Sequence, residues 1–164
     1  MTTATVRAAA PQDLEAIKAI AVAAEMFTNE EVEFFDDMFS GWLDGTLDGH
    51  RWLVSTDEND AVVAGANYAP EPFSDRLWNL YFIAVDPLHQ SNGIGADLIK
   101  QIEAELKAMS EELARVLLIE TSSTDQYSRT RQFYARIGYV EEARVREFYG
   151  PADDKVIFWK SLAQ

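Results

Sequence analysis

The residues best suited to do chemistry in this chain form a short turn, Gln90–Gly95, with the sequence QSNGIG. An apolar stretch, 77–85, precedes the turn, and an amphipathic stretch, 94–106, follows it. This pattern predicts a buried strand, a turn and then a helix. The first turn of a helix has four N–H groups without intrahelical partners and carries the positive end of the helix dipole, so it binds anions. We therefore expect this turn to hold the pyrophosphate of a cofactor.

Two common nucleotide-binding motifs fit this turn poorly. A dinucleotide-binding fingerprint needs a third glycine three residues after Gly-x-Gly, and the chain has Leu98 at that position. A phosphate-binding P-loop ends in Gly-Lys followed by Ser or Thr, whereas Gly95 is followed by Ala96 and Asp97. The spacing of the glycines therefore favours neither a Rossmann-type site nor a P-loop.

Composition excludes several other functions. The 164 residues contain no cysteine, which excludes disulfides, thiolate metal sites and a cysteine nucleophile. The formal net charge of −14 argues against a nucleic-acid partner, because neutralising phosphates needs clustered Lys and Arg, and an acidic surface instead attracts cations such as amines. No apolar run approaches the roughly 20 residues of a membrane helix, and the N-terminus lacks the pattern of a secretory signal. We expect a cytoplasmic protein with no metal site and no nucleic-acid or membrane partner.

Strand and helix patterns alternate along the chain, and we expect one domain over residues 1–164. A strand, a helix and another strand in succession, as at 77–122, imply two parallel neighbours joined by a right-handed crossover. The predicted fold class is α/β (or α+β), with a mixed central sheet of about seven strands flanked by about four helices. Strands are expected at 5–9, 51–56, 61–68, 77–85, 115–122, 139–149 and 155–162, and helices after Pro11, after Thr28, at 94–106 and at 127–137.

The spacing of apolar residues predicts which faces are buried. Both alternating faces of the strand at 77–85 are mainly apolar, which favours a central place in the sheet. On the helix at 94–106, large apolar residues repeat every four positions, and Lys100, Glu103 and Lys107 are expected to face outward. The expected buried stripe of that helix consists of Ile94, Leu98, Ile102 and Leu106.

The second predicted helix begins at a capping box, since Thr28 is followed three residues later by Glu31. Residues 30–48 hold seven acidic and no basic side chains, with aromatic residues between them. Two interpretations fit this segment: a solvated helix face, or an acidic rim beside a pocket for a cationic substrate. The inner face of the helix is expected to carry Val32, Phe35, Phe39 and Trp42.

Two segments resemble the GNAT superfamily of N-acetyltransferases. In its acetyl-CoA-binding motif, a Val-x-Pro strand end is followed by Arg or Gln, then x-x-Gly-x-Gly or Ala. The stretch 133–139 (FYARIGY) is similar to the family's Leu-Tyr-x-x-x-Gly-Phe signature, and it begins 38 residues after Gly95. Element order agrees over nearly the whole chain, so the resemblance implies a GNAT-like fold and acetyl-CoA as co-substrate. The residues that match the first motif are Val85, Pro87, Gln90, Gly93 and Gly95.

The resemblance also implies which residues bind the cofactor. The backbone of Ile83, Ala84 and Val85 would meet the acetyl group and pair with the pantetheine, with Ile83 or a neighbour stabilising the oxyanion. Tyr127 stands where an asparagine that contacts the pantetheine is common. Asn92 stands where the family often has a basic residue, so the phosphate would depend more on backbone amides. The residues expected to hold the pyrophosphate are Gln90, Ser91, Asn92, Gly93, Ile94, Gly95 and Ala96.

Catalytic roles follow from the same resemblance. It points to Tyr134 as proton donor, since a phenol of pKa near 10 can donate to a thiolate whose thiol has a pKa near 8.5; a core aromatic is the alternative role. Some family members carry a glutamate on the central strand, where this chain has Asn79. Glu120, at the end of the next strand, is then a candidate general base, and a structural carboxylate paired with a cation is the alternative. Tyr81 could line the acceptor pocket or act through water.

The expected function is an N-acetyltransferase that transfers an acetyl group to a primary amine, of a small molecule, by direct attack in a ternary complex. A protein N-terminal or lysine acetyltransferase is one alternative. A non-catalytic acyl-CoA-binding sensor is the other, and it is compatible with the missing glutamate at position 79. Specificity would come from the second helix, the loop 69–76 and the final hairpin. The aromatic residues of that hairpin allow a homodimer, and core burial explains them as well: Phe148, Phe158 and Trp159.

Overall fold

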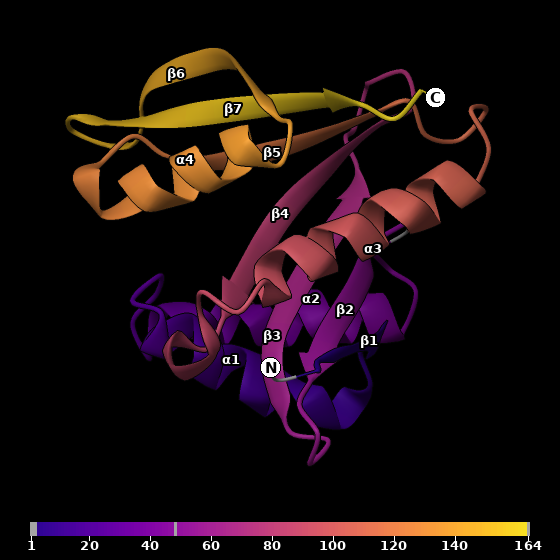
Figure 1. Ribbon diagram of the computed structural model, residues 1–164, viewed down its shortest axis with the longest axis vertical. Coiled ribbons are helices and arrows are strands. Elements are labelled where there is room, and N and C mark those ends of the chain that lie inside the picture. The colour runs from indigo at the N-terminus through magenta and orange to yellow at the C-terminus, as the bar shows by residue number, and fades with distance from the viewer. Residues whose placement is uncertain (1–2, 48, 164) are drawn as a thin grey trace. The chain divides into compact units, whose positions relative to one another are not determined.

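The computed structural model describes residues 3–47 and 49–163 (Figure 1). Its helices are α1 (Leu14–Ala23), α2 (Phe34–Leu43), α3 (Ile94–Ala108) and α4 (Ser128–Arg136). Its strands are β1 (Thr5–Ala8), β2 (Arg51–Thr56), β3 (Val62–Pro70), β4 (Leu77–Val85), β5 (Val116–Ser122), β6 (Val140–Gly150) and β7 (Asp153–Ser161). The element order is the predicted one, and most boundaries lie within two residues of those expected.

The described strands form one seven-stranded sheet in the order β1-β2-β3-β4-β5-β7-β6. β4 is the middle strand, which confirms the central place predicted from its two apolar faces. β4 and β5 are parallel, with Leu77 opposite Val116 and Leu80 opposite Ile119. β5 and β7, and likewise β6 and β7, are antiparallel, so the sheet is mixed as expected.

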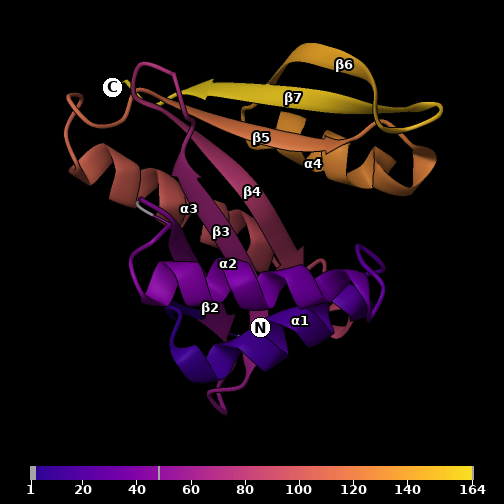
Figure 2. The same cartoon turned by 180° about the vertical axis from the view of Figure 1, so that it is seen from behind.

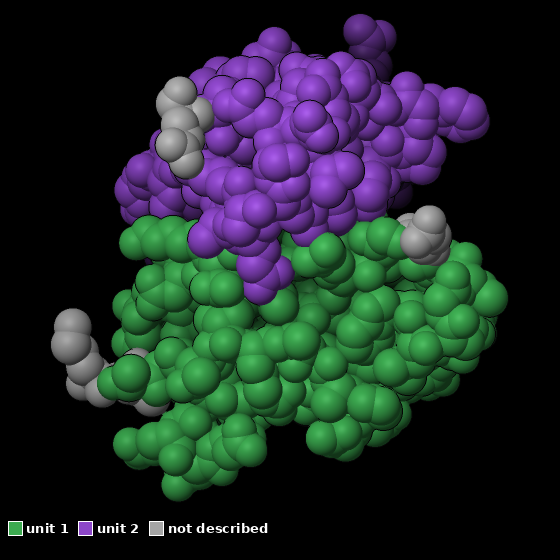
Figure 3. All heavy atoms as spheres, turned by 90° about the vertical axis from the view of Figure 1, so that its right-hand side faces the viewer, with its two compact units in different colours: residues 1–69, 82–102 green, residues 70–81, 103–164 purple. Residues whose placement is uncertain are grey.

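Two compact units make up the chain (Figure 3). Unit 1 comprises residues 1–69 and 82–102, and unit 2 comprises residues 70–81 and 103–164. In unit 1, α1 and α2 lie over one face of β2 and β3, as Figure 2 shows, and the start of α3 lies over the other face, which is towards the viewer in Figure 1.

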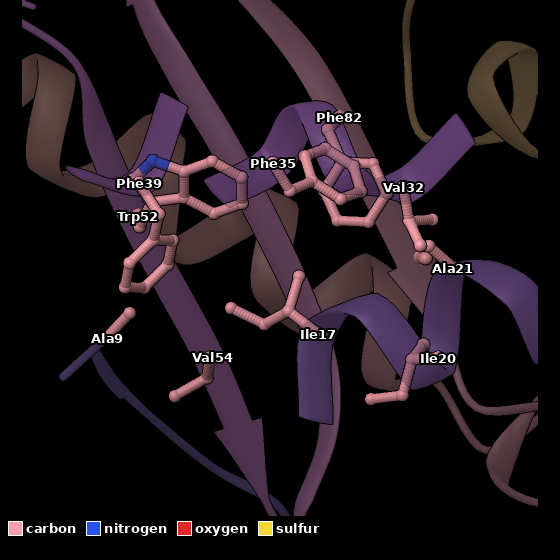
Figure 4. Close-up of a cluster of buried hydrophobic side chains, with 11 residues drawn as sticks. Ala9, Ile17, Ile20, Ala21, Val32, Phe35, Phe39, Trp52, Val54 and Phe82 are labelled. Carbon is pink, nitrogen blue, oxygen red and sulfur yellow. The ribbon is translucent and has the colours of Figure 1, made fainter. Parts of the chain in front are cut away.

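A buried hydrophobic cluster joins α1 and α2 to the strands of unit 1 (Figure 4). The Trp52 ring of β2 lies edge-on to Phe35, with centroids 5.9 Å apart, and 5.1 Å from Phe39. Phe35 and Phe39 are almost fully buried, which confirms the predicted inner face of the second helix, although Trp42 is only partly buried. Because these aromatic residues belong to the core, the acidic segment is better interpreted as a solvated helix face. Its last residue, Asp48, lies outside the described residues.

The capping box before α2 is present as predicted. The N–H of Thr28 donates to Glu31 Oε2 at 2.7 Å, and the N–H of Glu31 donates to Thr28 Oγ1 at 3.2 Å. These reciprocal bonds satisfy two donors that would otherwise have no partner at the helix start. The first turn after the box, Glu31–Glu33, is a 3-10 turn, and the α-helix itself begins at Phe34.

The buried stripe of α3 is confirmed, but one neighbouring prediction is wrong. Glu103 was expected to face outward and is instead buried in unit 2, where it accepts from the hydroxyl of Tyr139 at 2.8 Å and from Lys160 Nζ at 2.9 Å. Ile99 is also buried and lies one helical turn before Glu103, so the buried face of α3 is wider than a repeat of four residues suggests. The carboxylate is tolerated there because both of its partners are donors.

In unit 2, α4 packs against the hairpin of β6 and β7. The Tyr134 ring of α4 lies 5.5 Å from the Phe158 ring, centroid to centroid. Phe158 is buried, so core packing explains it, whereas Phe148 on β6 is more than half exposed. β7 begins at Asp153, two residues earlier than expected, because the turn that joins the two strands is shorter than predicted.

Candidate active site

The turn between β4 and α3, in unit 1, is held by hydrogen bonds at its β4 end. Gln90 Nε2 donates to the carbonyl oxygen of Val85 at 3.1 Å, so this side chain ties the turn to the last residue of β4. Asp86 Oδ1 accepts from the N–H of Leu88 at 3.0 Å, and the N–H of Asp86 donates to the carbonyl of Val63 at 2.8 Å. These bonds fix the path by which the chain enters α3.

Two residues of the turn adopt left-handed backbone conformations: Ser91, with a φ of 68°, and Gly93, with a φ of 80°. A Cβ added at Gly93 would meet no heavy atom within 4 Å, so the space beside this residue is open. The N–H of Asp97 donates to the carbonyl of Gly93 at 3.0 Å. The N–H groups of residues 94–96 therefore lie ahead of the first intrahelical bond. No Lys or Arg lies between Asp86 and Asp97, so an anion here would be held by backbone amides.

The end of β4 carries the three residues expected to meet the acetyl and pantetheine groups. Ala84 is buried, and Ile83 and Val85 are half-buried on the alternate face of the strand. The carbonyl of Val85 already accepts from Gln90. A carbonyl oxygen has two lone pairs, so a cofactor would share this oxygen with Gln90.

Tyr134, in unit 2, is buried within an aromatic cluster, with its ring 6.5 Å from that of Tyr139. Burial raises the pKa of Tyr134 well above its ordinary value, with a smaller contribution from Tyr127. The phenol is therefore protonated at neutral pH, but it is also a weaker acid than an ordinary tyrosine. Burial also raises the pKa of Tyr127, with Asp153 adding to the effect. The same packing suits the core-aromatic alternative, so the catalytic role of Tyr134 stays a prediction.

Glu120, on β5, is engaged on both of its carboxylate oxygens. Lys155 Nζ lies 2.9 Å from Oε2, and Asn79 Nδ2 donates to Oε1 at 2.9 Å. Lys155 Nζ also lies 3.5 Å from the centroid of the Phe148 ring. Both oxygens that a base would use are therefore already occupied by donors. This geometry favours the alternative in which Glu120 pairs with a cation, and its role as a base stays a prediction.

Glu71 also belongs to this network, although it is not among the predicted site residues. Its Oε2 accepts from the hydroxyl of Tyr81 at 2.6 Å and from Asn79 Nδ2 at 3.1 Å. One signal pointed toward such a partner. Asn79 and Tyr81 are polar residues on one face of an otherwise apolar strand, and buried polar groups need hydrogen-bond partners. The signal does not say which loop residue supplies them.

The profile of the Acetyltransferase (GNAT) family matches residues 14–139, which is most of the chain. The chain belongs to this family. It is therefore an acyltransferase of the N-acetyltransferase kind, and the fold and family that the two motifs implied are confirmed. Acetyl-CoA is the acetyl donor that this family uses.

Solved structures of the same fold agree with this assignment. A protein from Desulfovibrio desulfuricans assigned to the GNAT family is 29% identical, with a TM-score of 0.87, over 98% of this chain and all of that one. An aminoglycoside 6′-N-acetyltransferase complexed with coenzyme A is 15% identical, with a TM-score of 0.74, over 98% of each chain. The ribosomal-protein-alanine N-acetyltransferase from Escherichia coli is 19% identical, with a TM-score of 0.75, over 99% of this chain and 96% of that one. The last two are similar in fold alone. No curated protein sequence matches this chain.

No helix within 3–47 and 49–163 is long and apolar enough to cross a membrane. In the same residues, no group of three or more His, Cys, Asp or Glu side chains is arranged to hold a metal ion.

Proposed function

We propose that the protein transfers the acetyl group of acetyl-CoA to a primary amine of a small molecule, by direct attack in a ternary complex. When bound, acetyl-CoA supplies an acetyl thioester that a neutral amine can attack. The turn at the start of α3 would hold the pyrophosphate through the backbone amides of residues 93–96. The backbone of β4 from Ile83 to Val85 would orient the pantetheine and the acetyl group.

The observation that carries this proposal is the open, glycine-lined turn. Its unfilled space beside Gly93, its left-handed backbone and its free amide donors suit a phosphate without help from a cationic side chain. The backbone N–H donors of this turn therefore suit the pyrophosphate of coenzyme A. In unit 2, Tyr134 would keep its proton at the phenol oxygen for delivery to the leaving sulfur.

Two other functions each have a specific observation in their favour. Protein acetylation is supported by the fold similarity to an enzyme named for a ribosomal-protein alanine. An acyl-CoA-binding sensor is supported by Asn79, because an amide cannot take up a proton from the amine as a glutamate would. A small amine is preferred because the net charge of −14 attracts small cations.

A pair of glycine variants tests the donor site. Gly93 and Gly45 have nearly identical left-handed φ angles, 80° and 79°, and a Cβ at either would meet nothing within 4 Å. An alanine at either position costs about 1–2 kcal/mol of backbone strain, so the two variants should lose similar stability. Only Gly93→Ala should weaken acetyl-CoA binding, by about tenfold or more in calorimetry, since its Cβ would occupy the space beside the phosphate. Equal binding by both variants would remove the turn from the donor site.

An acceptor screen tests the reaction. Release of free thiol from acetyl-CoA should depend on small primary amines and should be absent with peptides that carry a free N-terminus or a lysine. Release with the peptides alone would favour the protein acetyltransferase. Tight acetyl-CoA binding without release for any acceptor would favour the sensor.

A further inference from the structure

A buried asparagine lies at the centre of the polar network in unit 2. Asn79 is fully buried, and its Nδ2 donates to Glu71 at 3.1 Å and to Glu120 at 2.9 Å. Because both neighbours are carboxylates, only the amide nitrogen can face them, and this fixes the orientation of the side chain. Its Oδ1 is buried and has no hydrogen-bond partner among the described residues. A buried acceptor without a donor costs about 1–3 kcal/mol, so a donor from outside the chain is expected here.

The two carboxylates of the network differ in whether a cation neutralises their charge. Glu120 is neutralised by Lys155 at 2.9 Å. Glu71 forms no ion pair within the part of the chain that the structure describes, and both of its hydrogen bonds go to Oε2. Its Oε1 and its negative charge are therefore available to a ligand.

The unused hydrogen-bonding capacity of this network consists of acceptors. It comprises Glu71 Oε1 and Asn79 Oδ1, whereas the hydroxyl of Tyr81 is already donated to Glu71. A positively charged group with several N–H donors, an ammonium, complements both the charge and the acceptors. Tyr81 is 41% exposed, so solvent reaches the network at this residue. Burial first, and then the negative charges of Glu71 and Glu120, raise the pKa of Tyr81, consistent with a negative potential that attracts a cation.

The chemistry of acetyl transfer decides which ammonium this would be. The attacking amine must be neutral, so a carboxylate that binds it as ammonium would stabilise the ground state and slow the reaction. A second amino group keeps its charge throughout, and binding it lowers the energies of bound substrate and transition state together. We propose that Glu71, positioned by Asn79 and Tyr81, binds a second, non-reacting ammonium group of the acceptor. The protein would then prefer diamines to monoamines. This inference rests on the proposed acetyl transfer to a small amine.

The test compares α,ω-diaminoalkanes of three to six carbons with n-alkylamines of the same lengths, in a thiol-release assay with acetyl-CoA. The wild type should favour the best diamine by about tenfold or more in kcat/KM, beyond the twofold statistical advantage of two amino groups. Glu71→Gln keeps the shape and the hydrogen-bond acceptor but removes the charge, and it should reduce this preference about tenfold. Glu142→Gln removes an exposed carboxylate on β6 and should leave the preference unchanged.

Each outcome decides one question. A wild type without preference for diamines, or a preference that survives in Glu71→Gln, overturns the role of Glu71 while leaving acetyl transfer intact. If acetyl-CoA binds but no amine of either series releases thiol, the proposed function fails instead. Calorimetric titration with the diamines then tests Glu71 separately: binding by the wild type and about tenfold weaker binding by Glu71→Gln supports the inference, and equal binding contradicts it.

Discussion

In the turn at the start of α3, the groups available to a ligand belong to the backbone, whereas in the network around Asn79 they belong to side chains. The turn offers the N–H groups of residues 94–96 and the open space beside Gly93. The network offers the free oxygens of Glu71 and Asn79, held by Tyr81 and by the Glu120–Lys155 pair. The first is a local feature of a few consecutive residues, and the second needs four separate segments of the chain to meet.

This difference predicts how each region responds to mutation. A site made of backbone amides changes only when the backbone changes, so most side-chain substitutions there should be mild. A network of side chains loses a partner with each truncation, and the remaining buried polar group then has no partner. Donor binding should therefore depend on the turn in unit 1, and acceptor chemistry and local stability on side chains of unit 2.

The largest expected effect tests whether turnover depends on side chains of unit 2 while acetyl-CoA binding does not. Tyr134→Phe removes one hydroxyl oxygen from unit 2 and leaves the aromatic packing with Phe158 in place. If the phenol delivers the proton, kcat should fall about 100-fold, which is the lower range for loss of a general acid. The affinity for acetyl-CoA, measured by calorimetry, should change less than twofold.

Tyr149→Phe is the matched control, since it removes a hydroxyl from a tyrosine of the same unit that is nearly half exposed. Its turnover should stay within twofold of the wild type. Unchanged turnover in Tyr134→Phe would assign this residue to the core and remove it from the mechanism.

The second effect concerns the Lys155–Glu120 pair, whose side chains are 13% and 19% exposed. Lys155→Met leaves Glu120 as a largely buried charge without a cation. Breaking a fully buried pair costs about 3–5 kcal/mol. Because this pair is partly exposed, the free energy of unfolding, measured by urea denaturation, should fall by about 2 kcal/mol. Adding Glu120→Gln to this variant should restore about half of the lost free energy of unfolding.

The matched control is Arg144→Met, which breaks an ion pair with Glu141 on the same strand, β6. The side chains of Arg144 and Glu141 are nearly half exposed, so the free energy of unfolding should fall by less than about 1 kcal/mol. Similar losses in both variants would mean that solvent, rather than the pair, stabilises Glu120. Acetyl-CoA affinity should be unchanged in both variants.

The same division explains what could be predicted from the sequence. The turn was found because its signal is local: glycines at a fixed spacing, after an apolar strand and before an amphipathic helix. The capping box at Thr28 and Glu31 was correct for the same reason, since its two partners are three residues apart. The central place of β4 followed from its composition alone, because only a covered strand has two apolar faces.

Interactions between distant residues were not predictable in this way. Glu71 lies in a proline-containing loop without periodicity, and its partners, Asn79 and Tyr81, are eight and ten residues away. Glu103 was predicted to be exposed because charged residues usually are, and its burial depends on Tyr139 and Lys160, 36 and 57 residues later in the chain. Periodicity shows which face of an element is apolar but does not show which polar partner meets it.

The smallest expected effect lies in the turn itself, at Gln90, whose side chain ties the turn to β4. Gln90→Ala removes the bond from Nε2 to the carbonyl of Val85, which is worth about 1 kcal/mol. If this bond only orders the turn, acetyl-CoA should bind about fivefold more weakly, with kcat unchanged. Leu88→Ala, at a highly exposed position just before the turn, should leave the affinity unchanged. If Gln90→Ala lost as much acetyl-CoA affinity as Gly93→Ala, a side chain would contribute as much to binding as the backbone does. The contrast between the two regions would then not hold.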